Sequence, residues 1–405
     1  TWNENQLDLK AEVTPSEKTH LFGEFMLRGF GLPKIAETKD LQRKDKDKAY
    51  PWAIEFKEAY IDFYGFLLKD LDLRIGRQRV AWGTADELNP TDNLNPDDFE
   101  DIWDFGKKLG TNSLKATYYL GDFTLTGVFI PIFTPAVLPD SDWASALSPS
   151  ESIPEGLKIQ NISDQIILPE NNPKKGSMGA IKVAKSLFNY DFSLSYFYGR
   201  DDLPLIDQVS IELVDTLGSV NVNTRLCYPR MQVVGLDMAG AIGDVGIWAE
   251  GALFFPEKVE MMTIIPTQSG MISQKSTALE DQGYFKYVVG GDYTFKNGLY
   301  VNGQFLHGFY HERGKDNLED YFMLGFEKKF LNDELKITLA GGTEIKKFDD
   351  LKDNYATIIF PEISYYPLDN TEILLGVYLI DGKETTNFGR VKENDEAYLK
   401  VKYSF

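Results

Sequence analysis

The sequence predicts an all-β protein, a closed antiparallel transmembrane β-barrel of about 16–18 strands with short periplasmic turns and long extracellular loops. Segments of about ten residues alternate apolar and polar side chains, and this is the length of a tilted membrane strand. Short and long connections alternate along the 405-residue chain. No run of about 18 apolar residues is present, so the sequence contains no helix that could span a membrane.

The first half begins with this alternation. Residues 7–13 place Leu7 and Leu9 on one face and Asp8 and Lys10 on the other, because successive strand residues point to opposite sides. After the turn PSEK the pattern returns over residues 21–28, and it continues over 58–67 and from Leu71 onward. We expect a strand in each segment.

The second half repeats the pattern more regularly. Expected strands cover residues 285–295, 299–309, 322–330, 335–346, 355–365, 375–379 and 397–405. About seventeen such segments occur in the whole chain, within the boundary errors of sequence reading.

The predicted barrel has short connections at one end and long connections at the other. The short connections are PSEK, LKD, LGD, FNYD, IGD, KNG, LND and PLDN. The long ones cover roughly residues 31–53, 83–111, 132–175, 201–229 and 255–282, with shorter ones near 312–316, 347–353 and 383–393. Outer-membrane barrels have short periplasmic turns and long outer loops, whereas a soluble β-sandwich, the main structural alternative, has no reason to separate them.

Residues 1–405 are predicted to form a single barrel domain. If both termini lie in the periplasm, the strand number must be even. An odd count therefore means that one segment is divided wrongly or that a further strand precedes Thr1.

Composition excludes several classes of function. A net charge of −20, from 42 basic and 62 acidic residues, argues against a nucleic-acid partner. Cys227 is the single cysteine and there are three histidines, so no intramolecular disulfide, Cys-based metal cluster or c-type haem motif can form. The few histidines also provide little for a Ser/His catalytic site, and we do not expect an enzyme.

Charged residues on the polar faces of the expected strands are candidates to line the lumen. Rows of acidic and basic side chains set an electric field across a pore, although they can also pair with one another and only stiffen the wall. The candidates are Glu24, Arg28, Glu58, Asp62, Arg74, Arg77, Arg79, Lys286, Asp292, Glu327, Lys336 and Glu344. Gly76 is expected to mark a bulge that decides which arginines point inward.

The long connection 83–111 is rich in carboxylates. Folded into the barrel, it would narrow the lumen and carry negative charge, and long loops are often functional. Its candidate residues are Asp86, Glu87, Asp92, Asp97, Asp98 and Asp101. Oxygen ligands at this density permit Ca²⁺, but no EF-hand pattern is present. A solvated surface loop is the alternative.

Two stretches carry a family resemblance. Leu399, Val401, Tyr403 and Phe405, alternating at the carboxyl terminus, resemble the signal that the barrel-assembly machinery reads in outer-membrane proteins. Residues 71–83, LDLRIGRQRVAWG, with the following ADELNPTDNLNPDDF, resemble a block in poorly characterised Gram-negative porins that are loosely related to alginate-export-type barrels. The resemblance implies location in the bacterial outer membrane, with its lipids and lipopolysaccharide as neighbours.

The resemblance implies a channel for passive diffusion of small polar or amphipathic solutes. Two alternatives stay open. A barrel sheath would house a periplasmic or extracellular partner such as a multihaem cytochrome, and it requires a wide lumen. An adhesin or receptor would act through its loops and would not conduct.

Overall fold

The computed structural model describes residues 3–31, 50–139, 141–144, 146, 158–215, 219–267 and 270–405, together with residues 33, 35, 38, 42 and 48. Thr1, before which a further strand was considered, lies outside the described residues. Seventeen strands form the main sheet, and each pairs antiparallel with the next one along the list. They are β1 (Asn5–Ser16), β2 (Thr19–Gly29), β3 (Trp52–Phe63), β4 (Leu71–Gln78), β5 (Thr111–Leu120), β6 (Phe123–Ile130), β8 (Met178–Leu187), β9 (Tyr190–Arg200), β12 (Arg230–Ile242), β13 (Val245–Pro256), β16 (Tyr284–Thr294), β17 (Tyr300–His307), β18 (Asp320–Phe330), β19 (Leu335–Ile345), β20 (Tyr355–Leu368), β21 (Thr371–Gly382) and β22 (Glu396–Tyr403).

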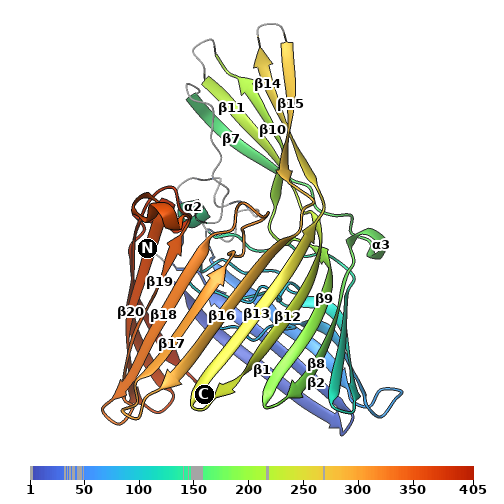
Figure 1. Ribbon diagram of the computed structural model, residues 1–405, viewed down its shortest axis with the longest axis vertical. Helices are drawn as coiled ribbons and strands as arrows, with labels where there is room; N and C mark the ends of the chain where they lie inside the picture. Colours follow the sequence, from blue (N-terminus) through green and yellow to red (C-terminus); the bar gives the residue numbers. More distant parts are fainter. Residues whose placement is uncertain are drawn as a thin grey trace.

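The main sheet curves into a barrel wall, with short turns at one end and long connections at the other (Figure 1). Asn189, Asn332 and Asn370 have positive φ in the short turns, a conformation that asparagine tolerates better than most residues. β1 pairs with β2 alone and β22 with β21 alone among the described residues. Since every pairing is antiparallel and seventeen is odd, β1 and β22 run in the same direction.

The alternation predicted from the sequence decides which side chains face outward. In β22, Leu399, Val401 and Tyr403 are 65–68% exposed on the outer side, and Phe405 follows them at 85%. One register shift occurs in β3, where Glu58 lies opposite Glu24 but Phe56 lies opposite Phe25. Lys57 is the extra residue of this bulge, so the alternation is kept on both sides of it.

A second sheet corrects the expectation that the long connections are only loops. Its five strands come from the segments 132–175, 201–229 and 255–282, and they project beyond the barrel (Figure 1). In the order in which they pair, they are β15 (Gly270–Leu279), β14 (Val259–Thr267), β10 (Leu205–Leu213), β11 (Ser219–Cys227) and β7 (Lys158–Ile166). In β10 and β11, valine and isoleucine alternate with polar residues as they do in the wall, and this pattern favours strands wherever a neighbour can pair.

The helical elements are short. They are α2 (Ser141–Ala144), α3 (Pro173–Gly176), η3 (Phe348–Asp353) and η4 (Phe388–Val391). Within the described ranges, no helix is long and apolar enough to cross a membrane.

Two apolar clusters lie between the wall and the segments that fold inside it. The first joins inward residues of β6, β8, β9, β12, β13 and β16 to Val80, Trp82 and Leu94. The second joins inward residues of β16, β17, β18, β20 and β21 to Leu88, Ile102, Phe309 and Phe388. A connection that packs apolar side chains against the wall is held in place by the same burial that stabilises a soluble core.

Candidate functional site

The residues between β4 and β5, numbers 79–110, fold into the barrel, and we call them the inner segment. Its first part is fixed to the far wall by Glu250, an inward residue of β13 with 3% exposure. The Glu250 carboxylate accepts hydrogen bonds from the backbone N of Thr84 (2.9 Å), Ala85 (3.2 Å) and Thr91 (2.8 Å). It also accepts bonds from Thr91 Oγ1 (2.7 Å) and Asn89 Nδ2 (3.2 Å).

Close approach to this carboxylate requires a glycine at position 83. Gly83 has φ +91°, and a Cβ added there would lie 2.5 Å from Glu250 Oε2. Any other residue would therefore have to move either the backbone or the carboxylate.

Side chains of three other wall strands contact the rest of the inner segment. On β17, the amide of Gln304 donates to the backbone oxygen of Asp86 (3.0 Å). On β21, the ring of Tyr378 stacks on Trp103 with centroids 4.5 Å apart. On β2, Arg28 NH1 donates to Glu100 at 2.6 Å. The inner segment thus crosses the lumen and contacts walls from both halves of the chain.

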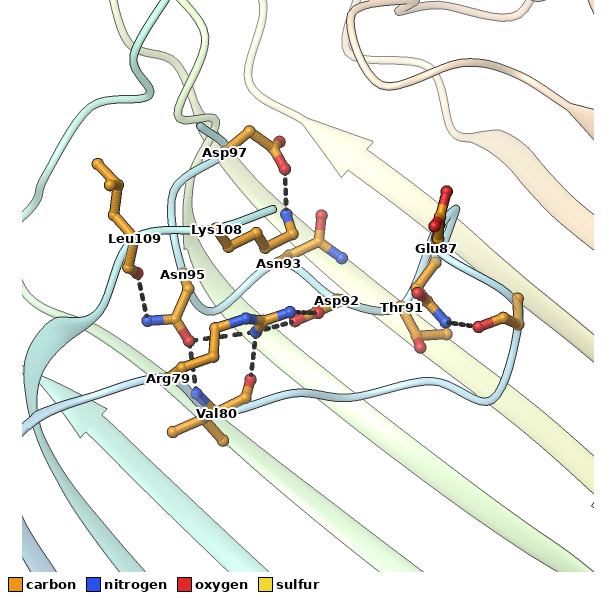
Figure 2. Close-up of polar contacts among 12 residues, drawn as sticks. Arg79, Val80, Glu87, Thr91, Asp92, Asn93, Asn95, Asp97, Lys108 and Leu109 are labelled. Atoms are coloured by element: carbon orange, nitrogen blue, oxygen red, sulfur yellow. Dashed lines mark hydrogen bonds and ion pairs between the residues drawn. The ribbon is translucent and has the colours of Figure 1, made fainter. Parts of the chain in front are cut away.

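Within the segment, Asn95 and Asp92 organise the turn (Figure 2). Arg79 forms an ion pair with Asp92. The Asn95 side chain accepts from Val80 N (2.7 Å) and donates to Leu109 O (2.9 Å). It therefore ties the start of the segment to its end.

A cavity of about 50 Å³ lies at the centre of this arrangement, between the two apolar clusters. Asp97 and Lys108 form a buried ion pair at 2.5 Å on one side (Figure 2). Arg313 pairs with Asp201, and both residues also line the cavity. Lys286 of β16 also lines the cavity, and it donates to the backbone oxygen of Phe309 at 2.5 Å.

Burial raises the pKa of three carboxyl groups in the segment, those of Glu87, Asp97 and Asp104. Burial raises the pKa of Asp97 to about 7, because the loss of hydration outweighs the attraction of Lys108. Glu87 is exposed to the lumen but surrounded by the barrel, and burial, with the nearby charges of Asp86 and Asp104, raises its pKa to about 7. These carboxyl groups therefore hold a proton more readily than a carboxyl group in water.

Of the predicted lumen residues, all but Arg77 lie on the inward side or in the inner segment. Several are paired: Arg74 donates to Asp62 at 2.6 and 3.0 Å, and Lys336 lies 3.7 Å from Glu327. The predicted residues that the structure places inside the barrel are Glu24, Arg28, Glu58, Asp62, Arg74, Arg79, Lys286, Asp292, Glu327, Lys336 and Glu344.

The prediction for Arg77 is wrong. The pairing of β4 with both neighbours has no register shift, so Gly76 does not mark a bulge. Arg74 and Arg77 are three residues apart and must face opposite sides. Arg77 lies opposite outward Ala59, and its Nε donates to the backbone oxygen of Lys57 at the β3 bulge (3.3 Å).

The predicted carboxylates of the inner segment are brought inside the barrel, but bases offset much of their charge. Asp92 pairs with Arg79, Asp97 with Lys108, and Asp98 with Lys107 at 3.1 Å. Asp86 accepts from Asn302 at 2.9 Å, and Asp101 accepts from the backbone N of Trp103. The constriction therefore carries charges of both signs, where the sequence indicated mainly negative charge.

In the part of the chain that the structure describes, no group of three or more His, Cys, Asp or Glu side chains could hold a metal ion. Calcium binding stays a prediction.

The sequence reasoning missed Glu250, Lys108, Asp201 and Arg313. Glu250 lies in the segment GIWAEGALFF, where the alternation could have placed it inward. The other three are in irregular connections, and no periodic pattern gives their position.

No family model matches this chain, and no curated protein matches it. Solved structures of outer-membrane porins match it in fold. OccAB2 of Acinetobacter baumannii has a TM-score of 0.52 and 10% identity, covering 99% of this chain and 91% of that chain. OccK9 (OpdG) of Pseudomonas aeruginosa has a TM-score of 0.51 and 11% identity, covering 99% and 90%. The likeness shows that the chain has the fold of outer-membrane porins.

Proposed function

We propose that this protein is a channel in the outer membrane of a Gram-negative bacterium, through which small polar or amphipathic solutes diffuse passively. The observation that carries the proposal is the inner segment. It crosses the lumen from β4 to the Glu250 carboxylate and forms a constriction in which paired acidic and basic side chains line one cavity. Such side chains exclude large solutes and orient polar ones.

The outward surface supports a location in lipid. Leucine, phenylalanine and tyrosine alternate along the outer side of the wall, and many are 40–70% exposed, among them Leu324, Leu339 and Leu375. A contiguous apolar surface of this kind is unfavourable in water and is what lipid requires. The expected partners, outer-membrane lipids, lipopolysaccharide and the barrel-assembly machinery, follow from this location.

Closure of the sheet is part of the proposal. Unpaired backbone groups at a sheet edge facing hydrocarbon cost several kcal/mol each, on the order of the cost for any unsatisfied polar group. We therefore expect β1 and β22 to be joined in the membrane, directly or through one further strand running opposite to both. The residues then form one barrel domain. Kinship with alginate-export-type barrels is an expectation from residues 71–99.

A sheath around a partner protein is not proposed. That function requires a wide lumen, and the two apolar clusters show the inner segment packed against the wall on both sides.

Swelling of proteoliposomes tests the channel. Vesicles that contain the purified protein are diluted into isotonic solutions of small sugars or amino acids of increasing size. We expect swelling with the smallest solutes and a steep fall with size. Vesicles that swell no faster than protein-free vesicles with every solute would contradict the proposal and favour a non-conducting receptor.

A further inference from the structure

Two arginines lie directly opposite each other at the extracellular edge of the wall. Arg230, the first residue of β12, pairs in register with Arg200, the last residue of β9. Like charges placed opposite each other across two strands are destabilising. The nearest carboxylate is that of Glu257, 4.0 Å from Arg200 NH1. Nε of Arg200 is buried and has no hydrogen-bond partner among the described residues.

α3 adds two lysines beside this pair. Arg230 NH1 donates to the backbone oxygen of Ser177 at 3.1 Å, and NH2 donates to that of Lys175. These bonds hold α3 against the outside of the barrel, where it protrudes next to β9 (Figure 1). Lys174 and Lys175 are both exposed to solvent. We call Arg200, Arg230, Lys174 and Lys175 the rim cluster.

The rim cluster has an excess of positive charge in an acidic protein. Its four cations have two carboxylates within ion-pair distance, Glu257 near Arg200 and Glu170 on Lys175. The chain as a whole has a net charge of −20. The rim cluster therefore carries an excess of two positive charges, although the chain as a whole is acidic.

The position of the cluster indicates its ligand. The Arg230 guanidinium lies 5.1 Å from the ring centroid of Tyr198, an outward residue of β9. Below it on the same outer side, Tyr196 is 41% and Leu194 54% exposed. Aromatic residues mark the membrane–water interface of such barrels. The cluster thus lies where lipid headgroups meet the extracellular medium.

We propose that the rim cluster binds a phosphate group of a phosphorylated glycolipid in the outer leaflet, with the lipid's acyl chains along Tyr196 and Leu194. The site rests on the proposed function for its location in the outer membrane. Guanidinium groups bind phosphate oxygens through parallel N–H bonds. A phosphate there would relieve the repulsion between Arg200 and Arg230.

Native mass spectrometry of the full chain in detergent tests the site. The protein is titrated with diphosphoryl lipid A and, separately, with lipid A from which both phosphates have been removed. The variants are Arg230→Gln, which removes one guanidinium, and Lys174→Gln, which changes an exposed side chain and leaves the fold intact. Lys352→Gln is the control, because Lys352 is an exposed lysine of η3, next to β20 on the other side of the barrel.

We expect wild-type protein to prefer the diphosphoryl lipid by about tenfold or more, since each charge-assisted hydrogen bond contributes roughly that factor. Arg230→Gln removes most of this preference, Lys174→Gln weakens binding several-fold, and Lys352→Gln does not change it. Equal binding of both lipids, or equal loss in Lys352→Gln, would overturn the proposal. Displacement of lipid A by inorganic phosphate would also overturn it. Swelling of proteoliposomes with small solutes is unaffected by these variants, so a negative result for lipid binding would not contradict the proposed channel.

Discussion

Glu250 Oε1 accepts hydrogen bonds from both the backbone N (2.8 Å) and Oγ1 (2.7 Å) of Thr91. The two residues are far apart in the sequence, one on wall strand β13 and the other in the middle of the inner segment. Glu250 Oε2 accepts further bonds from Thr84 and Ala85. One buried carboxylate thus sets how far the inner segment extends across the lumen.

Replacing Glu250 with glutamine should widen the constriction. The amide has the shape of the carboxylate, but it carries no charge and turns a donor toward N–H groups that need an acceptor. Each lost bond to a charged acceptor costs roughly 1.5–3 kcal/mol, so a destabilisation of about 3 kcal/mol or more is expected. Single-channel conductance should rise, and the melting temperature should fall.

Asp237→Asn is the matched control for this experiment. Asp237 is an equally buried inward carboxylate on the neighbouring strand β12, and it accepts a hydrogen bond from the Ser193 hydroxyl of β9 rather than from the inner segment. A rise in conductance in Asp237→Asn equal to that in Glu250→Gln would show that Glu250 has no special part in positioning the segment.

Ion selectivity should depend on pH through Glu87. Burial and the neighbouring acids raise its pKa to about 7, so the group is anionic above that pH and neutral below it. Reversal potentials in a salt gradient should therefore show weaker cation preference at pH 5.5 than at pH 8.5. Glu87→Gln should remove a large part of this pH-dependent change in reversal potential. Asp333→Asn, in a periplasmic turn, should behave as wild type, and an undiminished pH response in Glu87→Gln would exclude this assignment.

The Arg313–Asp201 pair should couple strongly in stability. Both side chains are about nine-tenths buried, and removal of one partner leaves a buried charge without compensation. Arg313→Ala should cost about 3–5 kcal/mol, while the double variant with Asp201→Ala should cost less than the sum of the two single changes. Urea unfolding of the four proteins gives the coupling energy. Additive losses would mean that the pair contributes nothing specific.

Arg74 and Arg77 provide a test of strand register. Cysteine at position 74 should react with a charged methanethiosulfonate reagent in the lumen, since Arg74 lies inward opposite Asp62. Cysteine at position 77 should face away from the lumen, and modification there should leave conductance unchanged. Block of current by modification at 77 and not at 74 would reverse the assigned faces of β4.

The alternation of apolar and polar residues predicted most of the wall, because a membrane strand has few ways to satisfy lipid on one side and water on the other. It placed the charges of β2, β3, β16, β18 and β19 inside correctly. It placed Arg77 on the wrong face, because the effect of Gly76 on strand register depends on the partner strands β3 and β5. Local sequence contains no information on how those strands pair.

The constriction was predictable only in outline. The length and acidity of residues 83–111 indicated an inner loop, but two of the ion pairs at the constriction join residues far apart in the sequence, Arg28 with Glu100 and Arg313 with Asp201. Which base meets which acid depends on how three connections pack together. For the same reason the five strands of the second sheet, two pairs of which are parallel, were not foreseen in segments expected to be loops.

Planar-bilayer recording of the purified full chain tests the central claim most directly. A barrel narrowed by one charged inner segment should give discrete, small conductance steps. Neutral polymers should reduce these steps only if they are small enough to enter the lumen. Glu250→Gln should increase both the conductance and the largest polymer size that enters. A protein that inserts into the bilayer and gives no steps, in the wild type and in Glu250→Gln alike, would contradict the account.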